Sequence, residues 1–279
     1  MPPILACHTN SYGHLGGAAA IQNVREAGVQ YLEIPIRTAG LRSRYDDPPL
    51  ITTDSTLADL QQLDRTLRAA DVSVCSFTCL AGNPLDPANV ALMCRKLDLA
   101  SHFGVKWVVG DAGSAESDAD RDTVYSHLRQ IGDYAGQLGI IVCLELQRGL
   151  CLNHREMLRV MAELQHPALR LNFDTGNLLC FNESIQGEVA LAKSCHLVKH
   201  VRLKDSSGRF GDADFPTLGR GGAVDFLRVY QILRDCGFKG PYSIEIAGAP
   251  SDGEFTLPDY QARIIESVSY LRRLGYFER

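Results

Sequence analysis

The sequence lacks the features of several other classes of protein. Its 28 lysine and arginine residues are outnumbered by 33 aspartate and glutamate residues, and the net charge of −5 gives no basic field for nucleic acid or an acidic membrane. No stretch approaches the roughly 18 apolar residues of a membrane span. The opening MPPILACHTN lacks the basic start and cleavage site of a secretory signal. We therefore expect a cytoplasmic protein without a nucleic-acid or membrane partner.

The cysteine and glycine patterns argue against several other kinds of structural and functional site. The nine cysteines are scattered without CxxC spacing, which disfavours a disulfide framework and a zinc ribbon. We expect most of them to be buried free thiols, including those in apolar runs, Cys7, Cys75, Cys143 and Cys195. The glycine-rich segment 219–222 lacks the lysine of a P-loop, and no GxSxG segment occurs. Nucleotide binding and a serine nucleophile are therefore not expected.

Short apolar runs of strand length alternate with amphipathic segments of helical length along the chain. The predicted strands are 4–7, 30–36, 72–77, 105–109, 140–146, 169–173, 198–203 and 242–246. The predicted helices are about 18–27, 57–70, 88–103, 121–138, 155–164, 185–195, 224–236 and 258–274. Eight such units in 279 residues predict an α/β fold, a (βα)₈ TIM barrel that residues 1–279 form as a single domain.

The irregular segments follow the predicted strands. In a (βα)₈ barrel the carboxyl ends of all strands lie on one face, where active sites are built. The segments expected on that face are 37–54, 82–87, 110–120, 206–222 and 248–257. Long loops on a single face are suited to enclosing a substrate.

Three carboxylates lie within or at the end of predicted strands. Glu145 and Glu245 occur inside the apolar runs VCLELQ and YSIEIAG, and Asp174 ends the run LRLNFD. Burying a carboxylate costs several kcal/mol unless it is paired or bound to a metal. Because strand ends converge in a barrel, we expect the three carboxylates to meet at its mouth.

A basic row faces the same site. Side chains alternate along a strand, so His200, Arg202 and Lys204 share one side of their strand. Three converging carboxylates repel one another, so either a divalent cation lies among them or Arg202 and Lys204 neutralise them. A hard divalent ion accepts oxygen ligands and would leave positions open for two substrate oxygens.

Further polar side chains at or near strand tips would face a substrate: His8, Glu33, Gln147, Asn177 and His200. For His8 and Glu33 a structural role also stays open, because the two would hydrogen-bond to each other inside the barrel. In the same way, Lys204 and Asp205 would form an ion pair at a strand end in a purely structural interpretation.

The order of several motifs resembles a known family. The motifs are ILACHTNSY, VQYLEIPI, VCLELQRG, NFDTGN, HVRLKDSSG, FPTLGRGGAVDF and GFKGPYSIEIAG. Together they resemble the sugar phosphate isomerase/epimerase group of xylose isomerase-like TIM barrels over almost the whole chain. The resemblance implies a divalent metal (Mn²⁺, Mg²⁺, Co²⁺ or Zn²⁺) held by Glu145, Asp174 and Glu245. It also implies a metal-binding histidine where this chain has Arg202.

Arg202 is the main departure from the family pattern. A guanidinium group stays protonated and has no lone pair for a metal. His200 lies on the same side of the strand but two residues, roughly 6.6 Å, earlier. Gln147 and the turn 219–221 also depart from the EnHG and GEG-like segments of the family. Two interpretations stay open: a metal completed by water or His200, or Arg202 in place of the metal as partner of the carboxylates.

The resemblance implies a sugar isomerase or epimerase acting on a small carbohydrate, sugar phosphate or polyol. Glu145 or Glu245 would remove the proton next to a metal-polarised carbonyl group, and its return would epimerise or isomerise the sugar. Arg202, Lys204 and Arg220 would bind an anionic substituent. Two alternatives stay open: a keto-sugar dehydratase or lyase of the inosose type, and a non-catalytic sugar-binding barrel with a decayed metal site. Such barrels often form homo-oligomers, and the sequence leaves that state open.

Overall fold

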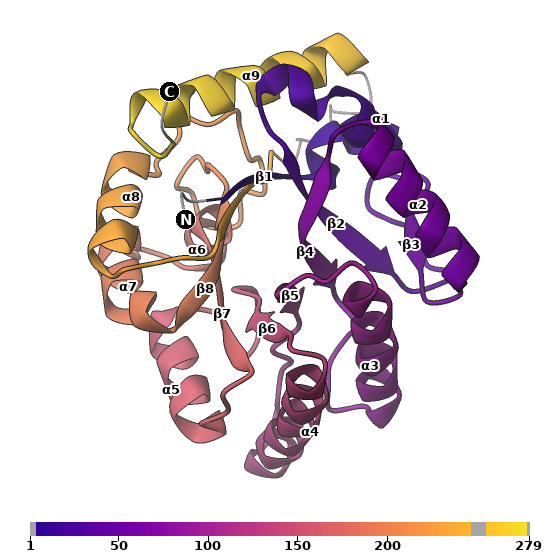
Figure 1. Cartoon of the computed structure of the whole chain (residues 1–279). Helices are drawn as coiled ribbons and strands as arrows, with labels where there is room; N and C mark the ends of the chain where they lie inside the picture. Colours follow the sequence, from indigo (N-terminus) through magenta and orange to yellow (C-terminus); the bar gives the residue numbers. More distant parts are fainter. Residues whose placement is uncertain (1–3, 247–254, 278–279) are drawn as a thin grey trace.

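The fold is a closed ring of parallel strands surrounded by helices (Figure 1). The computed structural model describes residues 4–246 and 255–277. The barrel strands are β1 (Ile4–His8), β2 (Tyr31–Arg37), β4 (Ser73–Cys79), β5 (Trp107–Gly110), β6 (Ile141–Leu144), β7 (Leu169–Asp174), β8 (Val198–Leu203) and β9 (Pro241–Ile244). They pair in the order β1-β9-β8-β7-β6-β5-β4-β2, and β1 also pairs with β2, which closes the ring.

The predicted (βα)₈ TIM barrel is confirmed. Every predicted strand range overlaps a barrel strand. The strands are apolar throughout because one face lines the barrel and the other packs under the helices. Val108, Val142, Leu171 and Val201 are all buried for this reason.

Helices form the outer layer of the molecule (Figure 1). The α-helices are α1 (Gly16–Asn23), α2 (Leu57–Ala69), α3 (Pro87–Ser101), α4 (Asp118–Gln137), α5 (His154–Leu164), α6 (Thr175–Phe181), α7 (Gly187–Ser194), α8 (Phe226–Asp235) and α9 (Leu257–Arg273). The 3-10 helices are η1 (Thr9–Leu15), η2 (Val24–Ala27) and η3 (Cys195–Leu197). Within the described ranges, no helix combines the length and apolar character needed to cross a membrane.

One short strand and one short α-helix were not predicted from the sequence, and neither was the 3-10 helix η1. Strand β3 (Ile51–Thr52) pairs with the end of β2 outside the ring. Helix α6 has seven residues and begins directly after Asp174, whose carboxylate accepts hydrogen bonds from the amides of Gly176 and Asn177. A helix this short shows too few turns for a helical pattern of apolar residues, so its capping residue is the only sequence signal.

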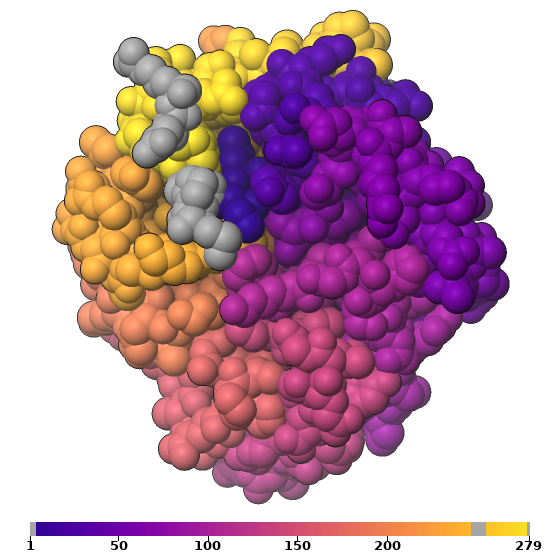
Figure 2. Space-filling model, in the orientation of Figure 1, coloured from indigo at the N-terminus to yellow at the C-terminus, as the bar shows by residue number. Residues whose placement is uncertain are grey.

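The ring also closes in its outer layer, where the first and last segments of the chain meet. Figure 2 shows the yellow C-terminal segment, which contains α9, beside the indigo N-terminal segment. The Tyr12 hydroxyl of η1 donates a hydrogen bond to Gln261 of α9 over 2.8 Å. The rings of His14 and Tyr260 pack edge to face nearby, with centroids 5.9 Å apart. These contacts join the two ends of the chain without a covalent link.

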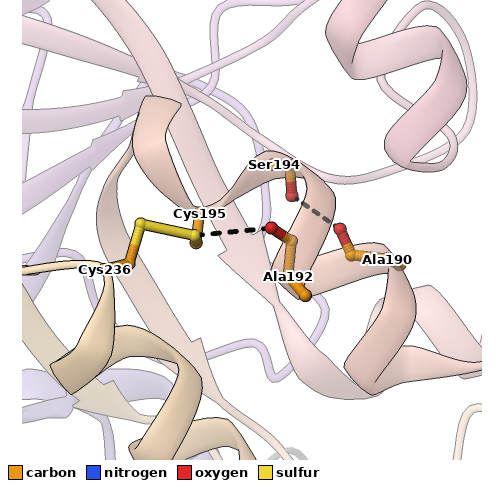
Figure 3. Close-up of a disulfide and its surroundings, with 5 residues drawn as sticks. All are labelled: Ala190, Ala192, Ser194, Cys195 and Cys236. Atoms are coloured by element: carbon orange, nitrogen blue, oxygen red, sulfur yellow. Dashed lines mark hydrogen bonds between the residues drawn. A yellow bond between two sulfur atoms is a disulfide. The ribbon is translucent and has the colours of Figure 1, made fainter.

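Two cysteines form a disulfide in the outer layer. Cys195 in η3 is bonded to Cys236 at the end of α8, with Cα atoms 6.3 Å apart (Figure 3). The expectation that Cys195 is a free thiol is therefore wrong. The two cysteines are 41 residues apart, a spacing from which no disulfide could be predicted. They meet because α7 and α8 are neighbours in the barrel's outer layer. The other cysteines are free, and all except Cys94 are buried.

Candidate active site

Buried charged side chains fill the barrel at the carboxyl ends of its strands. They come from six of the barrel strands or from the residues directly after them. Each is at most 6% exposed. We call this group the central charge cluster, and its members are His8, Glu33, Glu145, Asp174, Arg202, Lys204 and Glu245.

Strand register brings the cluster together. His8 lies opposite Glu33 in the pairing of β1 with β2, and Asp174 lies opposite Arg202 in the pairing of β7 with β8. Paired residues of neighbouring strands project on the same side of a sheet. All four side chains therefore point into the barrel at similar depth.

Arg202 is the centre of the cluster. Its Nη1 lies 2.6 Å from Glu145 Oε2, and its Nη2 lies 2.6 Å from Glu33 Oε1. Its Nε lies 3.5 Å from Glu245 Oε2, and Nη2 also donates a hydrogen bond to the Thr78 hydroxyl over 3.0 Å. One guanidinium group thus contacts three glutamate side chains, two of them at 2.6 Å.

Lys204 binds the remaining carboxylate. Its Nζ lies 2.8 Å from Glu245 Oε2 and 3.1 Å from Asp174 Oδ2. The same ammonium group donates to Asn177 Oδ1 over 3.3 Å, which places Asn177 at the edge of the cluster. Asp205 is not its partner, because the Asp205 carboxylate accepts amide hydrogen bonds from the loop that follows β8. The three carboxylates singled out in the sequence are therefore brought together around two cations.

His200 lies below the cluster and orients Glu145. Its Nδ1 donates to Asn172 Oδ1 over 2.7 Å, and the Asn172 amide donates to Glu145 Oε1 over 2.9 Å. Its other nitrogen, Nε2, accepts from the Ser76 hydroxyl over 3.0 Å, an assignment that satisfies all members of this chain of hydrogen bonds. Burial lowers the pKa of His200 to about 4, so its ring is neutral near pH 7.

Thr78 links His8 to Glu33 and was not singled out from the sequence. The Asn10 amide donates to His8 Nδ1, so Nε2 carries the proton and donates to the Thr78 hydroxyl over 3.1 Å. That hydroxyl donates to Glu33 Oε1 over 2.6 Å. The expected direct bond between His8 and Glu33 is absent, since their closest atoms are 3.9 Å apart. Thr78 was missed because it lies one residue beyond the predicted strand 72–77. It follows Ser76 by two residues, and this spacing places both side chains on the same face of β4.

The two glutamates that follow β6 and β9 differ in acidity. Burial raises the pKa of Glu145 to about 8, and the charge of Asp174 adds to the rise although Arg202 opposes it. Burial also acts to raise the pKa of Glu245, but Lys204 and Arg202 outweigh it and hold that pKa at about 2. Near pH 7 these shifts make Glu145 an acid that retains its proton and Glu245 a carboxylate.

Two residues expected to contact a substrate lie apart from the cluster. The Gln147 amide donates to Asp111 Oδ1 over 2.7 Å, so its side chain turns toward the loop after β5. Arg220 is exposed and forms an ion pair of 2.6 Å with Glu266 of α9. Sequence gave no sign of these partners, because both contacts join residues more than 30 positions apart.

Comparison with known proteins identifies the family. A family model described as a xylose isomerase-like TIM barrel matches residues 21–274. The chain belongs to this family. Over 222 residues it is 28% identical to L-ribulose-5-phosphate 3-epimerase UlaE of Salmonella paratyphi A, which covers 70% of this chain and 76% of that protein. The family resemblance expected from the motifs is confirmed.

Solved structures share the xylose isomerase-like barrel. A xylose isomerase-like TIM barrel protein from Mycobacterium smegmatis, in complex with magnesium, gives a TM-score of 0.76 at 19% identity, covering 98% of this chain and 96% of that chain. An L-ribulose 3-epimerase gives a TM-score of 0.74 at 15% identity, covering 98% of this chain and 94% of that chain. At such identities the likeness concerns the fold.

The central charge cluster does not fit the divalent metal that the family resemblance implies. Arg202 and Lys204 lie among the four carboxylates, where a metal would have to bind. Neither protonated cation has a lone pair for a metal, and both repel a divalent ion. His200 is no substitute ligand, since both its nitrogens are hydrogen-bonded. In the described part of the chain, no three His, Cys, Asp or Glu side chains have the spacing of a metal site. The geometry thus favours Arg202 in place of the metal.

Proposed function

We propose that this chain is a sugar isomerase or epimerase that moves a proton on the carbon next to a carbonyl group. The Salmonella relative and one of the similar structures are named as sugar epimerases. The observation that carries the proposal is the placement of Glu145 and Glu245 at two edges of the Arg202 guanidinium group, with pKa values displaced in opposite directions. Titratable groups whose pKa values are pushed apart are typical of an acid and base pair in catalysis.

In the first step, Glu245 removes the proton from the substrate carbon. As the C–H bond breaks, its electrons move into the carbonyl group and leave an enediolate with a negative oxygen. Arg202 Nε makes no hydrogen bond within the described residues, so this donor is available to that oxygen. A substrate oxygen bound there also weakens the hold of Arg202 on Glu245, which raises the basicity of the carboxylate.

In the second step, Glu145 supplies a proton. Its raised pKa leaves it protonated near pH 7, and Asn172 and Arg202 hold its two oxygens in place. Protonation of the same carbon from the opposite face gives the epimer. Protonation of the former carbonyl carbon, with transfer of the hydroxyl proton of the first carbon to the negative oxygen, gives the isomer. Positive charge comes from Arg202 and Lys204 in both steps, and no step requires a metal.

Two other functions use the same residues. A keto-sugar dehydratase or lyase would begin with the same proton removal, and the protonated Glu145 would then assist loss of hydroxide. A non-catalytic sugar-binding barrel is favoured by the ion pairs that Arg202 and Lys204 already form. The three functions differ in their products, so one experiment separates them.

The test is solvent deuterium exchange into a panel of small ketoses and ketose phosphates, followed by NMR. We expect the wild-type protein to incorporate deuterium at the carbon next to the carbonyl group of its substrate and to form the epimer or isomer. Incorporation with loss of water would instead identify the dehydratase. Binding of a sugar without any exchange would contradict the proposal and identify the non-catalytic barrel.

A further inference from the structure

A pocket of about 230 Å³ lies beside the central charge cluster. It is bounded by the ends of β2 and β4, by α3, and by residues 38–50, here called the β2–β3 loop. The residues of its wall that matter here are Asn10, Pro35, Arg42, Arg44, Thr78 and Lys96. Nothing in the family comparison assigns a role to this pocket.

The pocket adjoins the site of the proposed proton transfer through Thr78. Thr78 forms part of its wall, and the same hydroxyl contacts Arg202 over 3.0 Å and Glu33 over 2.6 Å. Pro35 follows Glu33 by two residues and so projects from the same face of β2. A substrate a few bonds long would therefore reach from Arg202 into this pocket.

Lys96 brings a buried positive charge to the pocket. It lies on the inner side of α3 and is 1% exposed. Its Nζ donates a hydrogen bond to the Leu80 carbonyl oxygen. Among the described residues, no carboxylate lies within ion-pairing distance of this ammonium group. Burial of a cation is costly, and it lowers the pKa of Lys96, although the charge of Asp111 acts in the opposite direction from beyond ion-pairing distance. An anion in the pocket would offset that cost.

The β2–β3 loop adds two arginines to the same pocket. Its base is held by Arg37, which binds both carboxylate oxygens of Asp47 over 2.7 and 2.8 Å. Arg42 and Arg44 lie further along the loop and are exposed where they line the pocket. No aspartate or glutamate is among the residues that line it. On a chain with a net charge of −5, this concentration of positive charge is a local feature.

The sequence placed the anion-binding role elsewhere. Arg202, Lys204 and Arg220 were expected to hold an anionic substituent, but all three are paired with carboxylates of the chain. The wall of this pocket carries four cations: Arg37, Arg42, Arg44 and Lys96. Arg37 is bound to Asp47, and Arg42 lies 3.9 Å from Asp46 in an exposed pair. Lys96 is the buried one.

We propose that this pocket binds a phosphate monoester group on the substrate, held by Lys96 from α3 and by Arg42 and Arg44 from the β2–β3 loop. A phosphate monoester carries about −1.5 to −2 charges at pH 7 and three acceptor oxygens, which suits a pocket whose wall carries these three cations from two elements. The inference rests on the proposed function, because it treats the anion as part of the isomerised sugar.

The direct test is titration calorimetry with inorganic phosphate at constant ionic strength. We expect the wild-type protein to bind phosphate, and Lys96→Met to weaken binding about tenfold or more, as loss of one charge-assisted contact predicts. The double variant Arg42→Gln/Arg44→Gln should weaken it similarly. Because both arginines are exposed, this variant should fold even if Lys96→Met does not.

A matched control removes the same charge from another surface. Arg228 and Arg234 are exposed on α8, and Arg228→Gln/Arg234→Gln should bind phosphate as the wild-type protein does. Equal weakening in this control would mean that phosphate responds only to net charge and would overturn the proposal. Absence of phosphate binding to the wild-type protein would overturn it as well.

Deuterium exchange separates failure of the pocket from failure of the proposed function. If ketoses exchange but phosphate neither binds nor competes with them, the pocket assignment is wrong and the function stands. If phosphate binds, and the loop variant loses it, but no ketose or ketose phosphate exchanges, the pocket assignment stands and the function is wrong. If both hold, the loop variant should raise the KM of a ketose phosphate by a larger factor than that of the unphosphorylated ketose.

Discussion

The central charge cluster and the neighbouring pocket both contain buried cations, but with different surroundings. Arg202 and Lys204 are each bound to at least two carboxylates of the chain itself. Lys96, by contrast, contacts a backbone carbonyl oxygen in a pocket that no carboxylate lines. The cations of the cluster therefore stabilise the acids of the barrel, whereas Lys96 forms no ion pair among the described residues. Substitutions that remove one cation from each region test this difference.

Removal of the cation from the cluster should have the largest effect. Arg202→Met leaves Glu33 and Glu145 buried without their ion-pair partner, so we expect the free energy of unfolding to fall by about 3–5 kcal/mol. Urea denaturation measures this, with the exposed Arg234→Gln as control, which should change stability by less than about 0.5 kcal/mol. A similar small change for both variants would show that the cluster does not depend on Arg202.

Isosteric changes of the two glutamates should act on catalysis. Glu145→Gln and Glu245→Gln keep the shape of each side chain but remove the proton-transfer group. We expect each to lower the rate of deuterium exchange by about 10²–10⁴-fold, the usual size of general acid and base contributions. Circular dichroism serves to verify the fold. A variant that folds and exchanges at the wild-type rate would remove that glutamate from the mechanism.

Sequence patterns located much of the cluster because strand parity and strand ends are local properties. The alternation of side chains predicted that Arg202 and Lys204 face the barrel, and the apolar runs around Glu145 and Glu245 predicted buried carboxylates. The missing histidine at position 202 was also visible. What the sequence left open was whether Arg202 or a metal balances the acids, since that depends on distances between strands.

The pocket was beyond the reach of sequence patterns. A lysine on an amphipathic helix is normally exposed, and Lys96 is buried only because α3 packs beneath the ends of β2 and β4. The β2–β3 loop has no periodic pattern, so the positions of Arg42 and Arg44 follow from the Arg37–Asp47 contact at its base. For the same reason the pairing of Arg220 with Glu266 was not foreseen.

The raised pKa of Glu145 predicts a pH dependence of stability. Below pH 4.5, its usual pKa, both the folded and the unfolded chain hold this proton. Between pH 4.5 and about 8 only the folded chain holds it, so the free energy of unfolding falls as the pH rises, by up to about 1.4 kcal/mol per unit. Glu145→Gln should lack this component. Parallel curves of unfolding free energy against pH for the two proteins would contradict the shift.

Removal of the cation from the pocket should have the smallest effect on stability. Lys96→Met removes a buried charge that forms no ion pair and also removes its hydrogen bond to Leu80. These two effects on the free energy of unfolding oppose each other, so we expect a net change within about 1 kcal/mol. Urea denaturation without phosphate provides the value. A loss as large as that of Arg202→Met would mean that Lys96 has a structural role like that of the cluster cations.

The most direct measurement of the central claim compares thermal unfolding of the wild-type protein and Arg202→His with and without Mn²⁺, after treatment with a chelator. Arg202 supplies the positive charge among the carboxylates, so the wild-type melting temperature should not respond to the metal. The histidine variant restores a ligand type with a lone pair and should gain a metal-dependent rise, as binding to the folded state requires. A metal-dependent rise in the wild-type protein would show that a divalent ion enters the cluster despite Arg202 and would contradict the account.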